Sequence, residues 1–150
     1  MLYNRKKIIG GAIMYDALEV AKYIINKAIE IEKPISNLQL QKILYFTHLE
    51  SLKQGEKLIG EPFEAWDFGP VVRKVYNKFC LWGANRLAFK EECTIKNLPK
   101  LDDMLVKLIQ TPAWELVERS HNPNGAWAKA YQEGSKNIIA DSYIQQEARR

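Results

Sequence analysis

Residues 36–47 read SNLQLQKILYFT. Ser36 with Gln39 three positions later is the pattern of a capping box, in which each side chain bonds the backbone N–H of the other residue. Four later residues recur at helical spacing and share one face: Leu40, Ile43, Leu44 and Thr47. The stretch therefore predicts a capped helix with one buried face, which we expect to end at Gly55. Gln41 is expected to point away from that face.

Helical signals continue on both sides of this stretch. Upstream, Asp16 with Glu19 predicts a second capping box, for a helix that ends before Pro34. Downstream, Pro70 suits the first turn of a third helix that stops at Gly83, because the N–H that proline lacks has no intrahelical partner there. Four more helices are expected: at residues 101–109, from a cap at Thr111 and a first turn at Pro112, around residues 127–131, and after Asp141.

The helical period is lost around residues 57–68, where an extended segment or a β-hairpin is expected. Strand alternation would place Phe63 and Ala65 on one face and Trp66 and Phe68 on the other, so that both faces need cover. The predicted fold class is mainly α: a single compact helical domain of about six to seven helices with this short insertion.

The composition is that of one globular domain. The chain has 150 residues, of which 47% are hydrophobic, and this is enough to fill a single core. No run approaches the roughly 18 uninterrupted apolar residues of a membrane-spanning helix, so no membrane partner is expected. We expect residues 1–13 to be a flexible N-terminal tail, residues 14–148 to be the domain and residues 149–150 to be a basic C-terminal end.

The sequence pattern shows neither a metal site nor a catalytic set. The cysteines, Cys80 and Cys93, and the histidines, His48 and His121, lack zinc-site spacing. No nucleophile with a base and an orienting group can be assembled, so we expect no cofactor, no metal ion and no enzyme activity. The cysteines fit reduced thiols, which indicates a cytoplasmic protein.

The basic character of the chain lies at its ends. The formal net charge is +4, but the five cations at positions 5–7 and 149–150 exceed it, so residues 8–148 sum to −1. A nearly neutral body has no excess of cations with which to bind the phosphates of a nucleic acid. The charge distribution therefore argues against nucleic acid as a partner.

Three segments together resemble the SocA-like antitoxin family, also called the Panacea antitoxin domain, which includes phage-associated GepA-like proteins. The first is LQLQKILY at residues 38–45, similar to the family's LKLQKLLYY helix. The second and most specific is FEAWDFGPVV at residues 63–72, similar to FEAWxYGPV. The third joins ELVERSH at residues 115–121 to GAW at residues 125–127, where Ala126 stands in place of the family's usual proline.

The resemblance implies a protein-binding antitoxin, commonly encoded by a prophage, that neutralises a co-encoded toxin by direct binding. For some members it also implies an adaptor mode, in which the toxin is delivered to a protease such as ClpXP. Whether the chain forms a homo-oligomer stays open. The residues assigned to the motif or to partner binding are Gln41, Tyr45, Trp66, Phe68, Gly69, Pro70, Val71, His121 and Trp127.

Two of these assignments have structural alternatives. Trp66, Gly69 and Pro70 form either a recognition feature or a structural corner, and we favour the corner, with the indole as a buried wedge. His121 is either a catalytic base or a helix-terminal residue whose ring bonds the last carbonyls, and we favour the terminal role.

The alternative function is a DNA-binding prophage regulator whose second and third helices form a helix-turn-helix pair. The segment from Gly55 to Gly69 is longer than the three or four residues that typically join such helices. The third helix also carries only Arg73, Lys74 and Lys78 as cations. Both features favour the antitoxin hypothesis.

Deleting residues 1–13 together with Arg149 and Arg150 is expected to abolish most of any binding to duplex DNA at low salt. Affinity for phosphates grows with the number of cations that displace counterions, and the remaining body is close to neutral. Gel-shift titrations of the full and shortened chains measure the effect. Sequence-specific binding that survives the deletion would favour the regulator instead.

Overall fold

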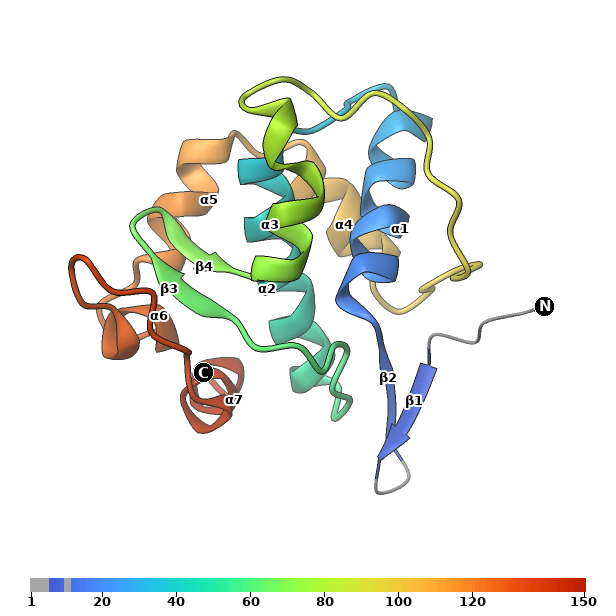
Figure 1. The fold of residues 1–150 in the computed structure, drawn as a ribbon. Helices are drawn as coiled ribbons and strands as arrows, with labels where there is room; N and C mark the ends of the chain where they lie inside the picture. The colour runs from blue at the N-terminus through green and yellow to red at the C-terminus, as the bar shows by residue number, and fades with distance from the viewer. Residues whose placement is uncertain (1–5, 10–11) are drawn as a thin grey trace.

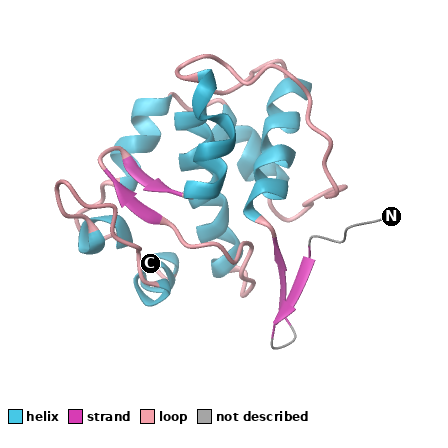
Figure 2. Ribbon diagram, viewed as in Figure 1, coloured by secondary structure: helices cyan, strands magenta, loops and turns pink. Residues whose placement is uncertain are grey.

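The computed structural model describes residues 6–9 and 12–150. In these residues a hairpin, two long helices, a second hairpin and a series of shorter helices follow one another (Figures 1 and 2). The elements are β1 Lys6–Ile9, β2 Ala12–Tyr15, α1 Ala17–Glu30, α2 Asn37–Lys53, β3 Glu64–Trp66, β4 Gly69–Val71, α3 Arg73–Phe79, the 3₁₀ turn η1 Cys80–Trp82, α4 Asp102–Ile109, α5 Ala113–Ser120, α6 Ala126–Ala130 and α7 Asp141–Ala148. The predicted fold class, mainly helical with a short β-hairpin insertion, is confirmed.

The first hairpin lies where the N-terminal tail was expected. β1 and β2 pair antiparallel, with Lys6 opposite Tyr15 and Ile9 opposite Ala12. The domain boundary that we placed at Met14 therefore falls inside β2. Residues 1–5 and 10–11 of the expected tail lie outside the described residues, and the flexibility of residues 1–13 stays a prediction.

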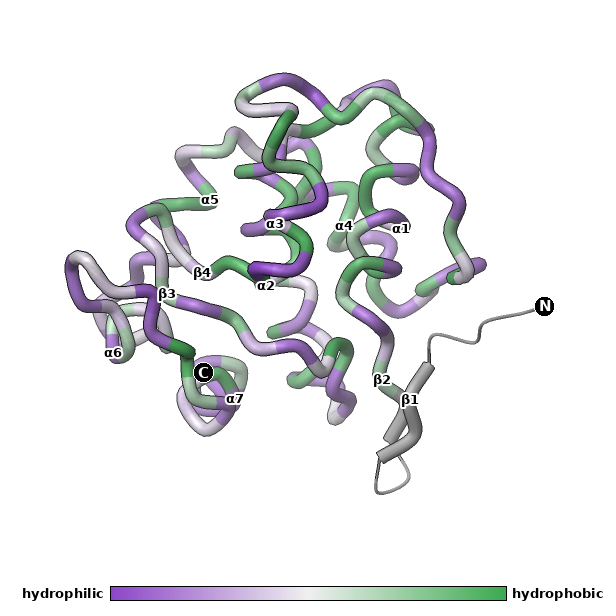
Figure 3. The backbone as a smooth tube through the Cα atoms, viewed as in Figure 1, coloured by the Kyte–Doolittle hydropathy of each residue, from purple (hydrophilic) through white to green (hydrophobic). Residues whose placement is uncertain are grey.

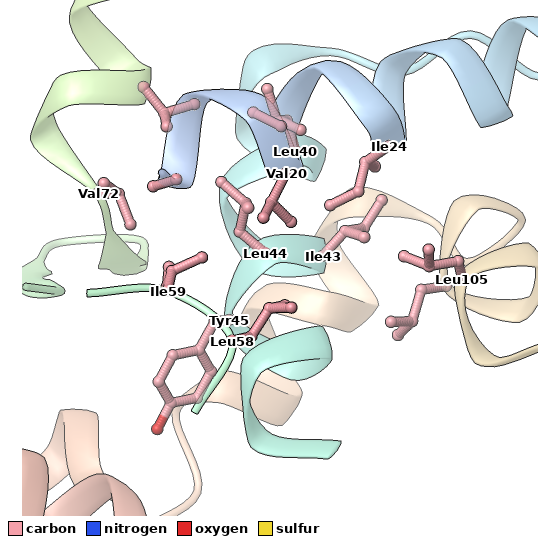
Figure 4. Packing of buried hydrophobic residues seen from close by; sticks show 14 of the residues in the cluster. Val20, Ile24, Leu40, Ile43, Leu44, Tyr45, Leu58, Ile59, Val72 and Leu105 are labelled. Carbon is pink, nitrogen blue, oxygen red and sulfur yellow. The ribbon is translucent and has the colours of Figure 1, made fainter. Parts of the chain in front are cut away.

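Helix α2 is the central element of the fold. It contacts α1, α3, α4, α5, α7 and β4, and Figure 4 shows its Ile43 between Val20 of α1 and Leu105 of α4. The predicted apolar face is confirmed, because Leu40, Ile43, Leu44 and Thr47 are fully buried. In Figure 3 the apolar residues gather where the helices face one another and the polar residues lie on the outer loops.

The burial of α2 extends beyond the predicted face. Gln41, expected to point outward, is only 1% exposed, and its neighbour Lys42 is fully buried. The expectation for Gln41 was wrong because β4 and α3 pack against the side of the helix that its sequence marks as polar. Tertiary packing here overrides the local pattern, and each buried polar group then needs a hydrogen-bond partner.

Local signals set the starts of the two long helices. The capping box at α2 is confirmed: Ser36 Oγ accepts from Gln39 N, and Gln39 Oε1 accepts from Ser36 N. At α1 the Asp16 side chain accepts from Leu18 N, as expected of an N-cap. The Glu19 carboxylate, expected to complete that box, accepts hydrogen bonds from the backbone and hydroxyl of Thr94.

The second hairpin corrects the expected start of the third helix. Pro70 was predicted in a first helical turn, but it lies in β4 opposite Ala65 of β3, and α3 begins at Arg73. Ala65 N donates to Asn137 O, on the side of β3 that faces away from β4. Ala65 and Pro70 are therefore a non-hydrogen-bonded pair, in which the backbone groups of the two residues do not bond each other. Proline is tolerated at such a position because the ladder needs no N–H from it.

The later helices follow the prediction, with corrections at Thr111 and Pro112. Helix α5 begins at Ala113, so Pro112, predicted in its first turn, is its N-cap residue, and it gives no side-chain cap. Thr111, predicted as that cap, instead donates from its hydroxyl to Lys107 O at the end of α4. None of the described helices is long and apolar enough to cross a bilayer.

Candidate functional site

Gln41 joins the central helix to the start of α3. Its Oε1 accepts from Val72 N at 3.0 Å, and Val72 is the N-cap residue of α3. Its Nε2 donates to Asn37 Oδ1 at 3.0 Å, and Asn37 Nδ2 in turn donates to Tyr76 O at 3.4 Å. This chain of amides fixes α3 beside the first two turns of α2.

Lys42 is a buried cation beneath the second hairpin. Its side chain is fully buried, and Nζ donates to Pro70 O at 2.7 Å. Among the described residues it forms no ion pair, so burial lowers the pKa of Lys42 to about 7. Lys42 was not assigned from the sequence, although it stands in the LQLQKILY segment, because lysine in a helix is usually solvated.

Gly69 permits this close approach. Its φ of +108° is rarely adopted by residues with a side chain, and a Cβ there would lie 2.5 Å from Ser120 Oγ and 2.9 Å from Lys42 Cε. Ser120 belongs to α5 and is itself fully buried. The glycine of the motif is therefore needed both for its backbone conformation and for the space it leaves.

Tyr45 joins α2 to α7. Its hydroxyl donates to Glu147 Oε1 at 2.6 Å, and the same oxygen accepts from Ala126 N at 2.8 Å. In Figure 4 this hydroxyl points away from the apolar cluster. The pKa of Tyr45 is raised well above its usual range by burial and by the Glu147 carboxylate.

Trp127 joins α6 to the second hairpin. Its indole Nε1 donates to Trp66 O at 2.7 Å, and its ring is stacked between His121, with centroids 3.8 Å apart, and Tyr131, at 4.4 Å. His121 is the C-cap residue of α5, as expected. Its buried Nε2, however, has no hydrogen-bond partner among the described residues, so this nitrogen does not bond the helix carbonyls.

A groove of about 570 Å³ opens on the other side of the same hairpin. Its walls come from the first turns of α2, from the β3–β4 hairpin, from α3 and η1, and from the loop before α7. The lining residues are Asn37, Leu38, Gln41, Lys42, Trp66, Asp67, Phe68, Val71, Tyr76, Cys80, Gly83, Ala84, Gly134, Ser135 and Lys136. A volume of this size is typical of binding sites in proteins.

Trp66 forms part of the groove wall. Its ring is partly exposed, lies 4.7 Å from the ring of Tyr76, and has Lys136 Nζ 4.2 Å from its centroid. Its Nε1 donates to Glu64 Oε1 at 3.0 Å. The expected buried wedge was wrong: the face of β3 that carries Trp66 is partly open, whereas Phe63 and Ala65 on its other face are buried.

Phe68 lies at the tip of the hairpin and is 54% exposed. Its ring meets the ring of Trp114, 60% exposed, edge to face at 5.4 Å. Trp114 belongs to the first turn of α5, and no sequence signal placed it beside the groove. These two aromatic side chains form an exposed pair at the groove's edge.

The nine residues assigned from the sequence thus fall into two groups. Gln41, Trp66, Phe68 and Val71 line the groove. Gly69 and Pro70 belong to the hairpin, and Trp127 bonds it at Trp66 O. His121 stacks on Trp127, and Tyr45 joins α2 to α7. In the described part of the chain no group of three or more His, Cys, Asp or Glu side chains could hold a metal ion.

Comparison with known proteins identifies the module. The family model described as "Antitoxin SocA-like, Panacea domain" matches residues 40–128. The chain belongs to this family. Antitoxin SocA from Caulobacter vibrioides (strain NA1000 / CB15N) is 37% identical, with 75% of this chain and 68% of that protein covered. No solved structure gives a significant match.

The residues matched by the SocA-like model contain all nine assigned positions but not Glu147. Glu147 is the acceptor for both Tyr45 and Ala126. Since Ala126 occupies the position of the family's usual proline, its N–H is a donor that proline would lack. The departure from the motif therefore adds a hydrogen bond between α6 and α7.

Gly69→Ala should destabilise the SocA-like domain more than Gly134→Ala. Both positions have positive φ, which costs a residue with a side chain about 1–2 kcal/mol. Only at Gly69 would the new methyl group also overlap neighbours, adding about 1–3 kcal/mol, whereas Gly134 has open space around it. Urea unfolding of both variants gives the comparison, and equal losses would contradict this account of the hairpin.

The free energy of unfolding should rise between pH 7 and pH 9.5 because of Lys42. Its folded pKa of about 7 lies below its unfolded value, so the unfolded state binds more protons in this window and stability increases with pH. The contribution is about 3 kcal/mol. Lys42→Met should remove this slope and Lys107→Met, an exposed control on α4, should keep it. Identical slopes in all three proteins would show that Lys42 is not the cause.

Proposed function

We propose that the chain neutralises a co-encoded protein toxin by binding it directly through the groove and the Phe68–Trp114 pair. Membership of an antitoxin family supports the general role. The observation that carries the proposed surface is the exposed aromatic pair beside a mainly apolar groove. Large aromatic side chains at such sites commonly act as anchors for a protein partner.

The proposed mechanism is occlusion, with the protein acting in the cytoplasm and without catalysis. The bound toxin would lose access to its target because the groove covers residues that the toxin needs for contact with that target. The hairpin suits this role because buried contacts with α2, α5 and α6 hold its base, while its tip stays exposed. A preformed surface loses little conformational entropy on binding.

The adaptor mode is the second form of this proposal. The same complex would then present the toxin to a protease such as ClpXP, and neutralisation would depend on degradation. The two modes differ in one measurable quantity, the lifetime of the toxin in cells that contain the antitoxin.

Co-expression with the product of an adjacent small reading frame tests the proposal. Growth should stop with that product alone and resume with the wild-type chain. Phe68→Ala combined with Trp114→Ala should weaken rescue and reduce affinity by about 2 kcal/mol or more, with little change in melting temperature because both rings are largely exposed. Phe89→Ala, which removes an aromatic ring that is 69% exposed outside the groove, is the matched control.

Full rescue by the double variant would contradict the proposed surface. Rescue in a host that lacks the protease, with an unchanged toxin lifetime, supports occlusion, and loss of rescue in that host supports the adaptor mode. An adjacent product that is harmless and does not bind the chain would overturn the proposed function itself.

A further inference from the structure

The groove is lined by an exposed cation. Three of its lining residues have acidic or basic side chains: Lys42, Asp67 and Lys136. Lys42 is enclosed and donates to Pro70 O, so its amino group does not face an occupant. Asp67 is exposed and accepts from the neutral hydroxyl of Tyr131 at 2.7 Å, so it remains an anion at the hairpin tip. Lys136 is exposed and forms no ion pair in the part of the chain that the structure describes, so it is the positive charge that an occupant would meet.

The carboxylate of Glu64, which lies within electrostatic reach of Lys136, is already engaged. Glu64 accepts two hydrogen bonds from the guanidinium of Arg73, at 3.0 and 2.7 Å, and a third from Trp66 Nε1. The Lys136 ammonium instead lies over the indole of Trp66 and is exposed. An ammonium held over an aromatic ring keeps its remaining donors available to an anion.

The walls next to this cation are apolar. Leu38 of α2, Val71 of β4 and Tyr76 of α3 face the groove with Trp66 and Phe68. An apolar side chain in the groove would gain burial, and a carboxylate beside it could reach Lys136. A nucleic acid backbone fits poorly, because one exposed cation among apolar walls does not match a row of phosphates.

We propose that the groove binds a short segment of the protein partner in which an apolar or aromatic side chain lies next to an acidic residue. The apolar side chain packs between Leu38, Tyr76 and Trp66, and the carboxylate pairs with Lys136. This inference rests on the proposed function, because it names the chemistry of the toxin segment that the groove accepts.

Selection of a random dodecapeptide library displayed on phage, with the intact chain as bait, tests this chemistry without knowledge of the toxin. The enriched peptides should place Asp or Glu beside Phe, Trp, Leu or Ile. A synthetic peptide of the consensus should bind about tenfold more weakly to Lys136→Glu than to wild type, and increasing salt should reduce this difference. Lys107→Glu makes the same charge change on α4, outside the groove, and should bind like wild type.

A second variant separates binding from folding. Phe68→Ala removes a side chain that is half exposed, so melting temperature should hold while peptide affinity falls. Enrichment without acidic residues, or equal binding to the Lys136→Glu and Lys107→Glu variants, would overturn the inference. A peptide that binds but does not compete with the adjacent-gene toxin would show that the toxin uses another surface, and would also overturn it. If the toxin does not bind the chain at all, it is the proposed function that fails.

Discussion

Helix α2 is enclosed by α1, α3, α4, α5, α7 and β4. A helix covered on most of its sides cannot leave polar side chains to water, and each unmet hydrogen bond in such a place costs about 1–3 kcal/mol. Gln41, Lys42 and Tyr45 meet this demand with Val72 N, Pro70 O and the Glu147 carboxylate. These three polar residues, which lie within five positions of α2, thus help to set where α3, the second hairpin and α7 lie.

This arrangement explains why one motif supplies both buried packing contacts and the walls of the groove. The hairpin that carries Trp66 and Phe68 has its inner surface fixed by Lys42, by Ser120 and by the indole of Trp127. Its outer surface forms the groove. A change to the inner contacts would therefore be transmitted to the outer surface without any residue of the groove being altered.

The sequence predicted what depends on near neighbours in the chain. The box at Ser36 and Gln39 and the stop at Gly55 set the bounds of α2, and both lie within a turn of the residues that they bond. Pro70 was misplaced because the same Gly-Pro pair suits a helix start and an outward-facing strand position, and the pairing with β3 decides between them. The resemblance identified the family, but the contact between Phe68 and Trp114 could not be foreseen, since these residues approach only in the folded chain.

The contact between Tyr45 and Glu147 spans 102 positions. On the ribosome, α2 is synthesised long before α7, so its apolar face has no complete cover while the intervening residues are made. Contacts of such large sequence separation close late and slow the folding of small domains. Under the proposed function, the delay between translation of α2 and of α7 limits how soon a newly made molecule can bind a toxin.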